Sequence, residues 1–222
     1  MLSIVVPTLN EAGSIVSALK RLEPLRRRGA EVIVVDGCSD DDTAALARPL
    51  ADRVIDAPRG RASQMNAGAA AATRDMLLFL HADTVLPDDA DALVHAGQAW
   101  GRFDVRIAGR HPLLRLVASM MNIRSRLSGV CTGDQAIFVR RALFTEIGGY
   151  PDIPLMEDIA LSKALRRRAR PSCLRQRVTT SGRRWESRGV MRTILLMWRL
   201  RFDYWRGVDP RILAIRYGYR PR

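Results

Sequence analysis

This chain of 222 residues has no long apolar run, only three cysteines and only two lysines. No uninterrupted apolar stretch approaches the roughly 20 residues of a membrane-spanning helix, so we expect no such segment. The three cysteines are odd in number and far apart, which argues against a disulfide framework or a zinc site and favours a reducing, cytoplasmic setting. The first residues lack a basic region and a cleavage site, and are interpreted as a strand, not a secretion signal.

Basic residues are present in excess, and their distribution is uneven. The chain is 47% hydrophobic and 27% charged, as in an ordinary globular protein of one domain, and its net charge is +13. Residues 163–222 contain 18 basic and 3 acidic side chains, a net of +15, whereas residues 1–162 have a net of −2. Genomic base composition explains why only two of the basic residues are lysines, but it does not explain this asymmetry. The basic end is expected to attract phosphate groups of nucleic acid, anionic lipid or a phosphorylated substrate.

Short apolar runs alternate with helical patterns in the first half of the chain. Strands are predicted at 3–6, 32–35, 53–56 and 76–80, and helices at 15–22, around 44–46 and over 62–73. This alternation predicts βαβ units and a parallel sheet, in which ligands bind at the carboxyl ends of the strands. Carboxylates and arginines follow these strands, at 8–11, 36, 58–61 and 81–83. Such a rim suits a phosphate ligand bridged by a metal.

The second half shows a less regular pattern. Helices are predicted over 88–100, 113–127 and 157–168, and a strand at 136–139. In residues 102–107, apolar Phe103, Val105 and Ile107 alternate with charged residues, which predicts a strand buried on one face only. The whole chain is therefore assigned to the α/β class.

Four motifs occur in order along the chain: VVPTLNE at 5–11, VDGCSDDDT at 35–43, LHADT at 80–84, and GGYP at 148–151 followed by MEDIAL at 156–161. Together they resemble the nucleotide-sugar-dependent glycosyltransferases of family 2, and most of all small stand-alone bacterial members with "HAD" and "LMED". The resemblance implies a GT-A fold, with a Rossmann-like, mostly parallel sheet flanked by helices. It also implies an inverting transfer from a UDP-linked sugar to a hydroxyl acceptor. The basic C-terminal end, and not the resemblance, favours an acceptor that is lipid-linked or close to a membrane.

The resemblance places donor-binding residues in the first half of the chain. Asp36 is expected to accept hydrogen bonds from the nucleotide base, and Asp83 to hold a divalent metal, Mn²⁺ or Mg²⁺. His81 stands where many members have Asp, which weakens the metal site. The alternative for both acids is a turn residue after a strand. The full set of expected nucleotide-sugar contacts is Pro7, Thr8, Asn10, Glu11, Asp36, Arg61, Asn66, His81 and Asp83.

Catalysis and acceptor binding are expected from the second half. Asp158 is the predicted base that removes the acceptor proton, and the adjacent Glu157 would hold the acceptor or position Asp158. The alternative is an acid pair that merely favours a helix start. Asp134 and Gln135 precede a predicted strand and would line the acceptor pocket, unless they form a tight turn. Arg184 and Trp185 resemble the family's Arg-Trp pair, although the usual Gln is not in register.

We expect one glycosyltransferase domain over 1–185, with a nucleotide-binding half at 1–85 and an acceptor half at 86–185, followed by a basic helical tail at 186–222. Apolar residues recur at i, i+4 through 190–206, with arginines on other faces. This predicts an amphipathic helix that either packs on the enzyme body or binds an anionic membrane surface.

Two other functions compete with this interpretation. A sugar-phosphate nucleotidyltransferase would show a Gly-rich basic loop after the first strand, and residues 7–11 contain neither Gly nor a basic side chain. A basic nucleic-acid-binding protein would show an RNP, KH or helix-turn-helix signature, and none is found. We therefore expect no nucleic-acid partner.

Overall fold

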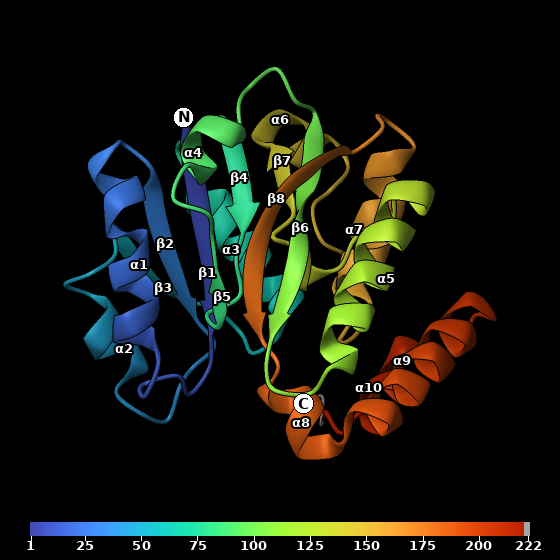
Figure 1. The fold of residues 1–222 in the computed structure, drawn as a ribbon. Helices are drawn as coiled ribbons and strands as arrows, with labels where there is room; N and C mark the ends of the chain where they lie inside the picture. Colours follow the sequence, from blue (N-terminus) through green and yellow to red (C-terminus); the bar gives the residue numbers. More distant parts are fainter. Residues whose placement is uncertain (220–222) are drawn as a thin grey trace.

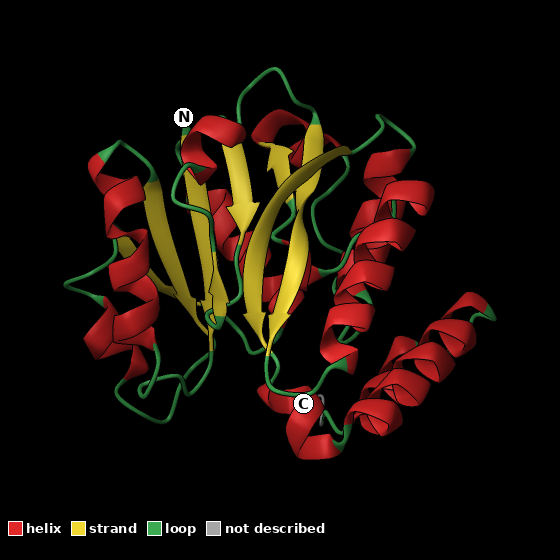
Figure 2. Ribbon diagram, viewed as in Figure 1, coloured by secondary structure: helices red, strands yellow, loops and turns green. Residues whose placement is uncertain are grey.

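A computed structural model describes residues 1–219 of the chain. Its centre is a twisted eight-stranded sheet in the order β3-β2-β1-β4-β7-β6-β8-β5, with helices on both faces (Figures 1 and 2). The three cysteines are free. Among residues 1–219 there is no helix with the length and apolar character needed to span a membrane.

The first half of the sheet is parallel, as predicted. Strands β1 (Leu2–Thr8), β2 (Glu31–Asp36), β3 (Arg53–Asp56) and β4 (Met76–Phe79) are joined by α1 (Ile15–Arg27), α2 (Thr43–Ala47) and α3 (Arg61–Ala71). Alternate residues of β1 enter two different cores, because successive side chains of a strand point to opposite faces. Helix α3 lies so close to the sheet that a Cβ on Gly68 would be 2.3 Å from Val5 Cγ1.

The second half adds antiparallel pairs, so the sheet is mixed and not purely parallel. Strand β7 (Phe138–Arg140) pairs antiparallel with both β4 and β6 (Trp100–Ala108). Strand β8 (Ser172–Ser181) is parallel to β6 and antiparallel to the short β5 (Thr84–Val85). Helices α5 (Leu113–Ser128), α6 (Arg141–Glu146) and α7 (Glu157–Arg166), with the 3₁₀ turn η1 (Gly133–Gln135), complete this half. The arrangement keeps the Rossmann-like core at β1–β4.

The predicted helix over 88–100 is wrong. Helix α4 covers only Ala90–Leu93, and β6 begins at Trp100. The Trp100 side chain is fully buried, and its Nε1 donates a hydrogen bond of 2.8 Å to the Ala169 carbonyl oxygen. This tertiary contact, together with the ladder to β7, outweighs the local helical pattern. Strand β8 was not predicted. Its pairing with β6 shifts register between Phe103 and Asp104, and this irregularity interrupts the alternation of apolar and polar residues along β8.

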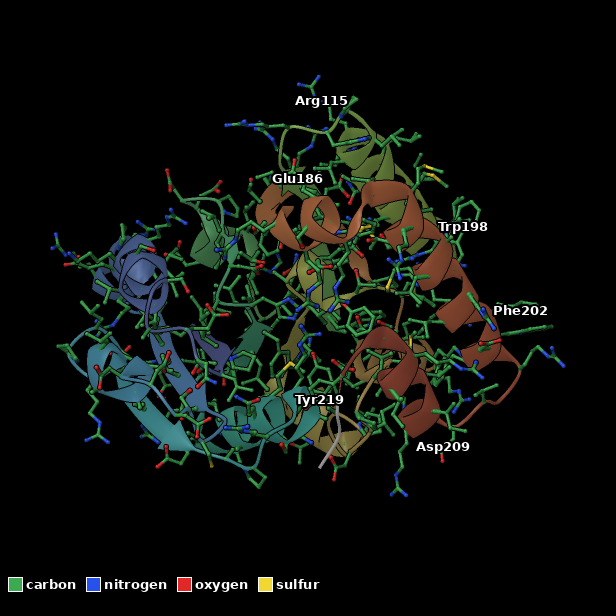
Figure 3. All side chains as sticks on the ribbon, turned by 90° about the horizontal axis from the view of Figure 1, so that it is seen from below. Arg115, Glu186, Trp198, Phe202, Asp209 and Tyr219 are labelled. Atoms are coloured by element: carbon green, nitrogen blue, oxygen red, sulfur yellow. The ribbon has the colours of Figure 1, made fainter. Side chains whose placement is uncertain are left out.

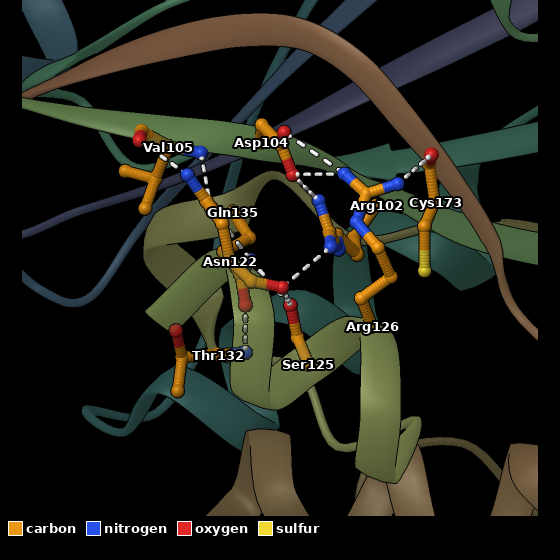
Figure 4. A network of polar contacts seen from close by, with 9 residues as sticks. All are labelled: Arg102, Asp104, Val105, Asn122, Ser125, Arg126, Thr132, Gln135 and Cys173. Atoms are coloured by element: carbon orange, nitrogen blue, oxygen red, sulfur yellow. Dashed lines mark hydrogen bonds and ion pairs between the residues drawn. The ribbon is translucent and has the colours of Figure 1, made fainter. Parts of the chain in front are cut away.

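One charged residue of β6 faces inward, against expectation. Arg102 is fully buried, where it is paired with the Asp104 carboxylate and donates to the Asn122 carbonyl oxygen at 3.1 Å (Figure 4). Arg126 donates to the same carboxylate at 2.8 and 2.9 Å. These contacts fasten α5 to the sheet, because each charge in the interior must be paired.

The C-terminal helices α8 (Arg183–Arg188), α9 (Val190–Trp205) and α10 (Pro210–Tyr217) lie at the end of the sheet where β1–β4 finish (Figure 1). Leu200, Leu213 and Ala214 pack with Leu155, Met156 and Ile159 in a third apolar cluster. One face of the predicted amphipathic helix therefore packs on the enzyme body. Its opposite face remains exposed.

Candidate functional site

A pocket of about 660 Å³ opens at the carboxyl ends of the parallel strands. Its walls come from the residues after β1 and β4, the starts of α3 and α7, the turn η1, and helices α5, α8, α9 and α10. Figure 3 shows this end of the molecule, with α8, α9 and α10 beside the residues that follow the strands. Segments up to about 200 residues apart in sequence thus share one cavity, as strand-end rules predict.

Eleven of the residues expected from the sequence line this pocket. They are Pro7, Thr8, Glu11, Arg61, His81, Asp83, Asp134, Glu157, Asp158, Arg184 and Trp185. Four others lie outside it: Asn10, Asp36, Asn66 and Gln135.

Asp158 lies in the first turn of α7 and is held by two main-chain groups. Its Oδ2 accepts a hydrogen bond from the Gly133 N–H at 3.0 Å, and its Oδ1 accepts one from Ile159 at 2.7 Å. Burial raises the pKa of Asp158, although these hydrogen bonds and the Arg61 charge oppose the shift. The result is a positioned carboxylate with increased proton affinity, which is the property of a general base.

Glu157 is the more deeply buried of the pair, with 5% of its surface exposed. Burial and the neighbouring Asp158 charge raise its pKa to about 7, while the Arg61 guanidinium lowers it. Met156, in the left-handed conformation with φ of 70°, turns the chain into α7 immediately before the two acids. The turn therefore brings both acids to the same pocket.

His81 and Asp134 form a contact across the pocket. His81 Nδ1 is 3.4 Å from Asp134 Oδ1, and a Cβ on Gly133 would lie 2.5 Å from His81 Nε2. Burial raises the pKa of Asp134, but the contact with His81 and the Arg61 and Arg184 charges together outweigh it, and the net shift is downward. Because a Cβ at position 133 would collide with the His81 imidazole, this position requires glycine.

Asp83 has an exposed side chain at the pocket, next to Thr84, whose hydroxyl lies 3.5 Å from Asp83 Oδ1. Across residues 1–219, His, Cys, Asp and Glu side chains nowhere gather in threes suited to a metal ion. A divalent cation bound by Asp83 would therefore require further oxygen ligands from a bound molecule or water.

Asp36 ends β2 and is 3% exposed. Its two carboxylate oxygens accept hydrogen bonds from Ser39, at 2.7 Å from the main-chain N–H and 2.6 Å from the hydroxyl. Asn10, with φ of 54°, accepts from the Asp40 N–H at 2.8 Å. These two residues join the loops after β1 and β2, and neither lines the pocket.

Asn66 does not fit a role in nucleotide binding. Its side-chain amide donates to the Tyr150 carbonyl oxygen at 2.8 Å and accepts from the Tyr150 N–H at 2.9 Å. Gly149, with φ of 74°, leaves the room for this clamp, since a Cβ there would be 2.7 Å from Asn66 Oδ1. The GGYP motif therefore holds the main chain at Gly149 and Tyr150 against α3, before the chain enters α7.

Gln135 likewise does not fit the acceptor role expected for it. It is fully buried, and its amide nitrogen donates to Ser125 Oγ at 3.0 Å and to Asn122 Oδ1 at 3.4 Å (Figure 4). Its oxygen accepts from the Thr132 N–H at 3.3 Å. Gln135 therefore fixes η1 against α5, with no polar group left for a ligand.

Two arginines that the sequence did not single out also line the pocket. Arg124 of α5 has Nε and Nη2 buried without a hydrogen-bond partner, and Arg201 of α9 has Nε in the same condition. Burial lowers the pKa of Arg124, although the Asp158 charge opposes this. A charged residue inside the apolar pattern of α5 was the available signal for Arg124.

The C-terminal helices close one side of the pocket. Arg184 Nη1 donates to the Tyr217 hydroxyl at 2.6 Å, and the guanidinium lies 5.6 Å from the Tyr217 ring centroid. Tyr217 and Tyr219 themselves line the cavity. These contacts join residues that are distant in the sequence, so sequence motifs could not predict them.

Comparisons with known proteins agree with this geometry. Residues 3–110 match the model of Glycosyl transferase family 2. A PGL/p-HBAD biosynthesis glycosyltransferase of Mycobacterium bovis is 34% identical over 170 residues, which cover 68% of this chain and 63% of the relative. The match thus spans somewhat less than two thirds of that relative's length.

Solved structures show the same fold. The crystal structure of S. aureus TarS 1–349 in complex with UDP-GlcNAc has a TM-score of 0.65 and 20% identity, over 81% of this chain and 58% of that one. Mannosyltransferase PcManGT from Pyrobaculum calidifontis, in complex with GDP-Man and Mn²⁺, has a TM-score of 0.64 and 23% identity, over 99% and 65%. The family model, the relative and the shared GT-A fold together show that this chain belongs to glycosyltransferase family 2.

Proposed function

We propose that the protein transfers a sugar from a nucleotide-sugar donor to a hydroxyl acceptor, with inversion at the anomeric carbon. The donor that we propose is a UDP-linked sugar. The observation that carries the proposal is the partly buried Asp158 carboxylate, held by main-chain N–H groups in a pocket that also contains residues from the ends of β1 and β4. Family membership supports the reaction class. The TarS complex with UDP-GlcNAc supports a uridine donor, and the PcManGT complex with GDP-Man supports a nucleotide sugar in general.

The donor would occupy the side of the pocket formed by residues 1–85. Pro7 and Thr8, at the end of β1, and Glu11, in the loop after it, line this side. Asp36 would act there by positioning the loops after β1 and β2 through Ser39. Arg61, at the start of α3, is suited to the diphosphate because a helix N-terminus and a guanidinium both favour anions.

Asp83 is the proposed metal ligand. A single exposed carboxylate fits a hard divalent cation that obtains its other oxygens from the diphosphate and water. When bound, Mn²⁺ or Mg²⁺ would neutralise the charge of the departing diphosphate. The Mn²⁺ in the PcManGT structure supports such a cation without distinguishing it from Mg²⁺.

Asp158 would accept the proton of the acceptor hydroxyl. The acceptor oxygen forms the new bond to the anomeric carbon as the bond to the diphosphate oxygen breaks, and a single displacement inverts the configuration. Glu157, Asp134, Arg184 and Trp185 would hold the acceptor on this side. His81 would orient Asp134 through the contact at 3.4 Å.

The test has two stages. A thermal-shift screen of nucleotide sugars with and without Mn²⁺ identifies the donor, since a ligand of the folded state raises the melting temperature. Turnover with a panel of alcohols is then followed by release of nucleoside diphosphate, and NMR of the product gives the anomeric configuration. Release of pyrophosphate would favour the nucleotidyltransferase alternative, and retained configuration would overturn the single displacement.

A further inference from the structure

Exposed apolar side chains are concentrated on three helices. Among residues 1–219, eleven of the fourteen large hydrophobic residues that are exposed lie on α5, α9 and α10. We call this set the docking face: Leu116, Met120, Ile123, Leu127, Met191, Leu195, Trp198, Phe202, Trp205, Ile212 and Ile215. Apolar patches of this kind on a soluble domain mark interaction sites.

The docking face is regular. On α9 its members recur with the helical period on the side opposite to the buried Val190, Thr193 and Leu200. Trp205 is 75% exposed and Trp198 is 57% exposed. Figure 3 shows Trp198 and Phe202 pointing outward from α9. The helix therefore has two apolar faces, and only one of them is used in packing.

The docking face reaches the mouth of the pocket. Met120 of α5 and Trp198 of α9 are both about half exposed and both line the cavity. Helices α5 and α9 are in contact. A surface bound to this face would therefore lie at the opening through which an acceptor enters.

The charge around the docking face is positive. The same helices carry Arg115, Arg192, Arg199 and Arg211, and Arg206 directly follows α9. These arginines are exposed and form no ion pair within the described structure. The one acid inside α9, Asp203, is already paired with Arg216 at 2.5 Å. An apolar stripe with interfacial tryptophans and flanking arginines is typical of helices that lie in a membrane surface.

We propose that the docking face binds the surface of an anionic phospholipid bilayer, so that the pocket opens toward the lipid headgroups. A second copy of this chain is the less favourable occupant. A two-fold interface would place the unpaired arginines of both copies against one another, and like charges repel. Anionic headgroups complement both the arginines and the apolar stripe. The proposal does not rest on the proposed reaction, because binding to a surface requires no turnover.

Co-sedimentation of the full chain with vesicles tests this proposal. Phosphatidylglycerol–phosphatidylcholine vesicles at low salt should bind the protein, vesicles of phosphatidylcholine alone should bind it far less, and added salt should release it. The variant L195Q/F202Q/W205Q, at exposed positions outside the pocket, should bind at least tenfold more weakly. R192Q/R199Q should lose about tenfold in affinity at low salt, because arginines near an anionic surface each contribute substantially.

Matched controls lie on the far side of the molecule. L46Q on α2 and R21Q/R48Q change exposed residues of the same types, and both should bind vesicles as the wild type does. Circular dichroism confirms that each variant is folded. The proposal is overturned if the wild type stays in the supernatant at low salt, or if the triple variant binds like the controls. A wild-type dimer that the triple variant converts to monomer, without vesicle binding, would assign the face to a second copy.

Discussion

The Gly133 N–H donates a hydrogen bond of 3.0 Å to Asp158 Oδ2, and so links the turn η1 to the first turn of α7. The same turn positions Asp134 beside His81. One short segment therefore orients both the proposed base and an acceptor-side carboxylate. Hydrogen bonds from the Gly133 and Ile159 N–H groups restrain the Asp158 side chain, which suits a catalytic base that must reach the same proton in every cycle.

Replacing Asp158 by Asn should abolish turnover and leave donor affinity nearly unchanged. The amide retains the size of the side chain and an oxygen for the Gly133 N–H, but it loses the acceptor for the Ile159 N–H and cannot take up a proton. Removing a general base typically costs about 10²- to 10⁴-fold in rate. Initial rates and calorimetric titration with the donor measure the two quantities separately. Near-wild-type turnover would assign the base elsewhere, with Glu157 the next candidate.

Asp83 and Asp36 should differ in how they affect donor binding. Asp83→Ala is expected to remove the part of nucleoside diphosphate binding that Mn²⁺ stimulates. Asp36→Ala should weaken binding with and without Mn²⁺, because it releases Ser39 and with it the loops beside the donor side of the pocket. Calorimetry on both variants in the presence and absence of Mn²⁺ decides this. Identical profiles would show that the division of roles is wrong.

Glu157 should make stability depend on pH. Its pKa rises from 4.5 to about 7 on folding, because burial and Asp158 disfavour the charged form. The folded state thus holds more protons than the unfolded state between these values, and stability is lost as pH rises through 7. Glu157→Gln should therefore be more stable than the wild type at pH 8, by on the order of 3 kcal/mol, with little difference at pH 4.5. Urea unfolding at both pH values measures it; a difference independent of pH would contradict the assignment.

Replacing Arg124 should lower turnover without lowering the stability of the fold. Two of its buried nitrogens have no hydrogen-bond partner, and burying them costs desolvation energy in the free protein. We therefore expect Arg124→Met to keep or raise the free energy of unfolding, by on the order of 1 kcal/mol, and the melting temperature with it. Turnover should fall, since the charge facing the pocket is lost. Arg126→Met is the matched control on the same helix. It breaks the pair with Asp104 and should destabilise the protein. A stable, fully active Arg124→Met variant would remove Arg124 from the site.

The sequence by itself determined the local elements and the edge of the sheet where the site lies. Apolar β-branched runs become β1 and β2 because they are buried on both faces, and the polar residues after them then meet by topology alone. The four motifs contain seven of the eleven predicted pocket residues, including Asp158 and Asp83.

Tertiary structure alone decided the rest. Asn66 and Gln135 have the chemistry of ligand-binding residues, but their amides are used by Tyr150 and by Ser125, partners 84 and 10 residues away. Trp100 became the start of a strand because its burial and its bond to Ala169 outweighed a helical pattern. Arg124 joined the site because packing turned one face of α5 toward the cavity. Periodicity specifies which residues share a face, but which neighbour that face meets is settled by long-range packing.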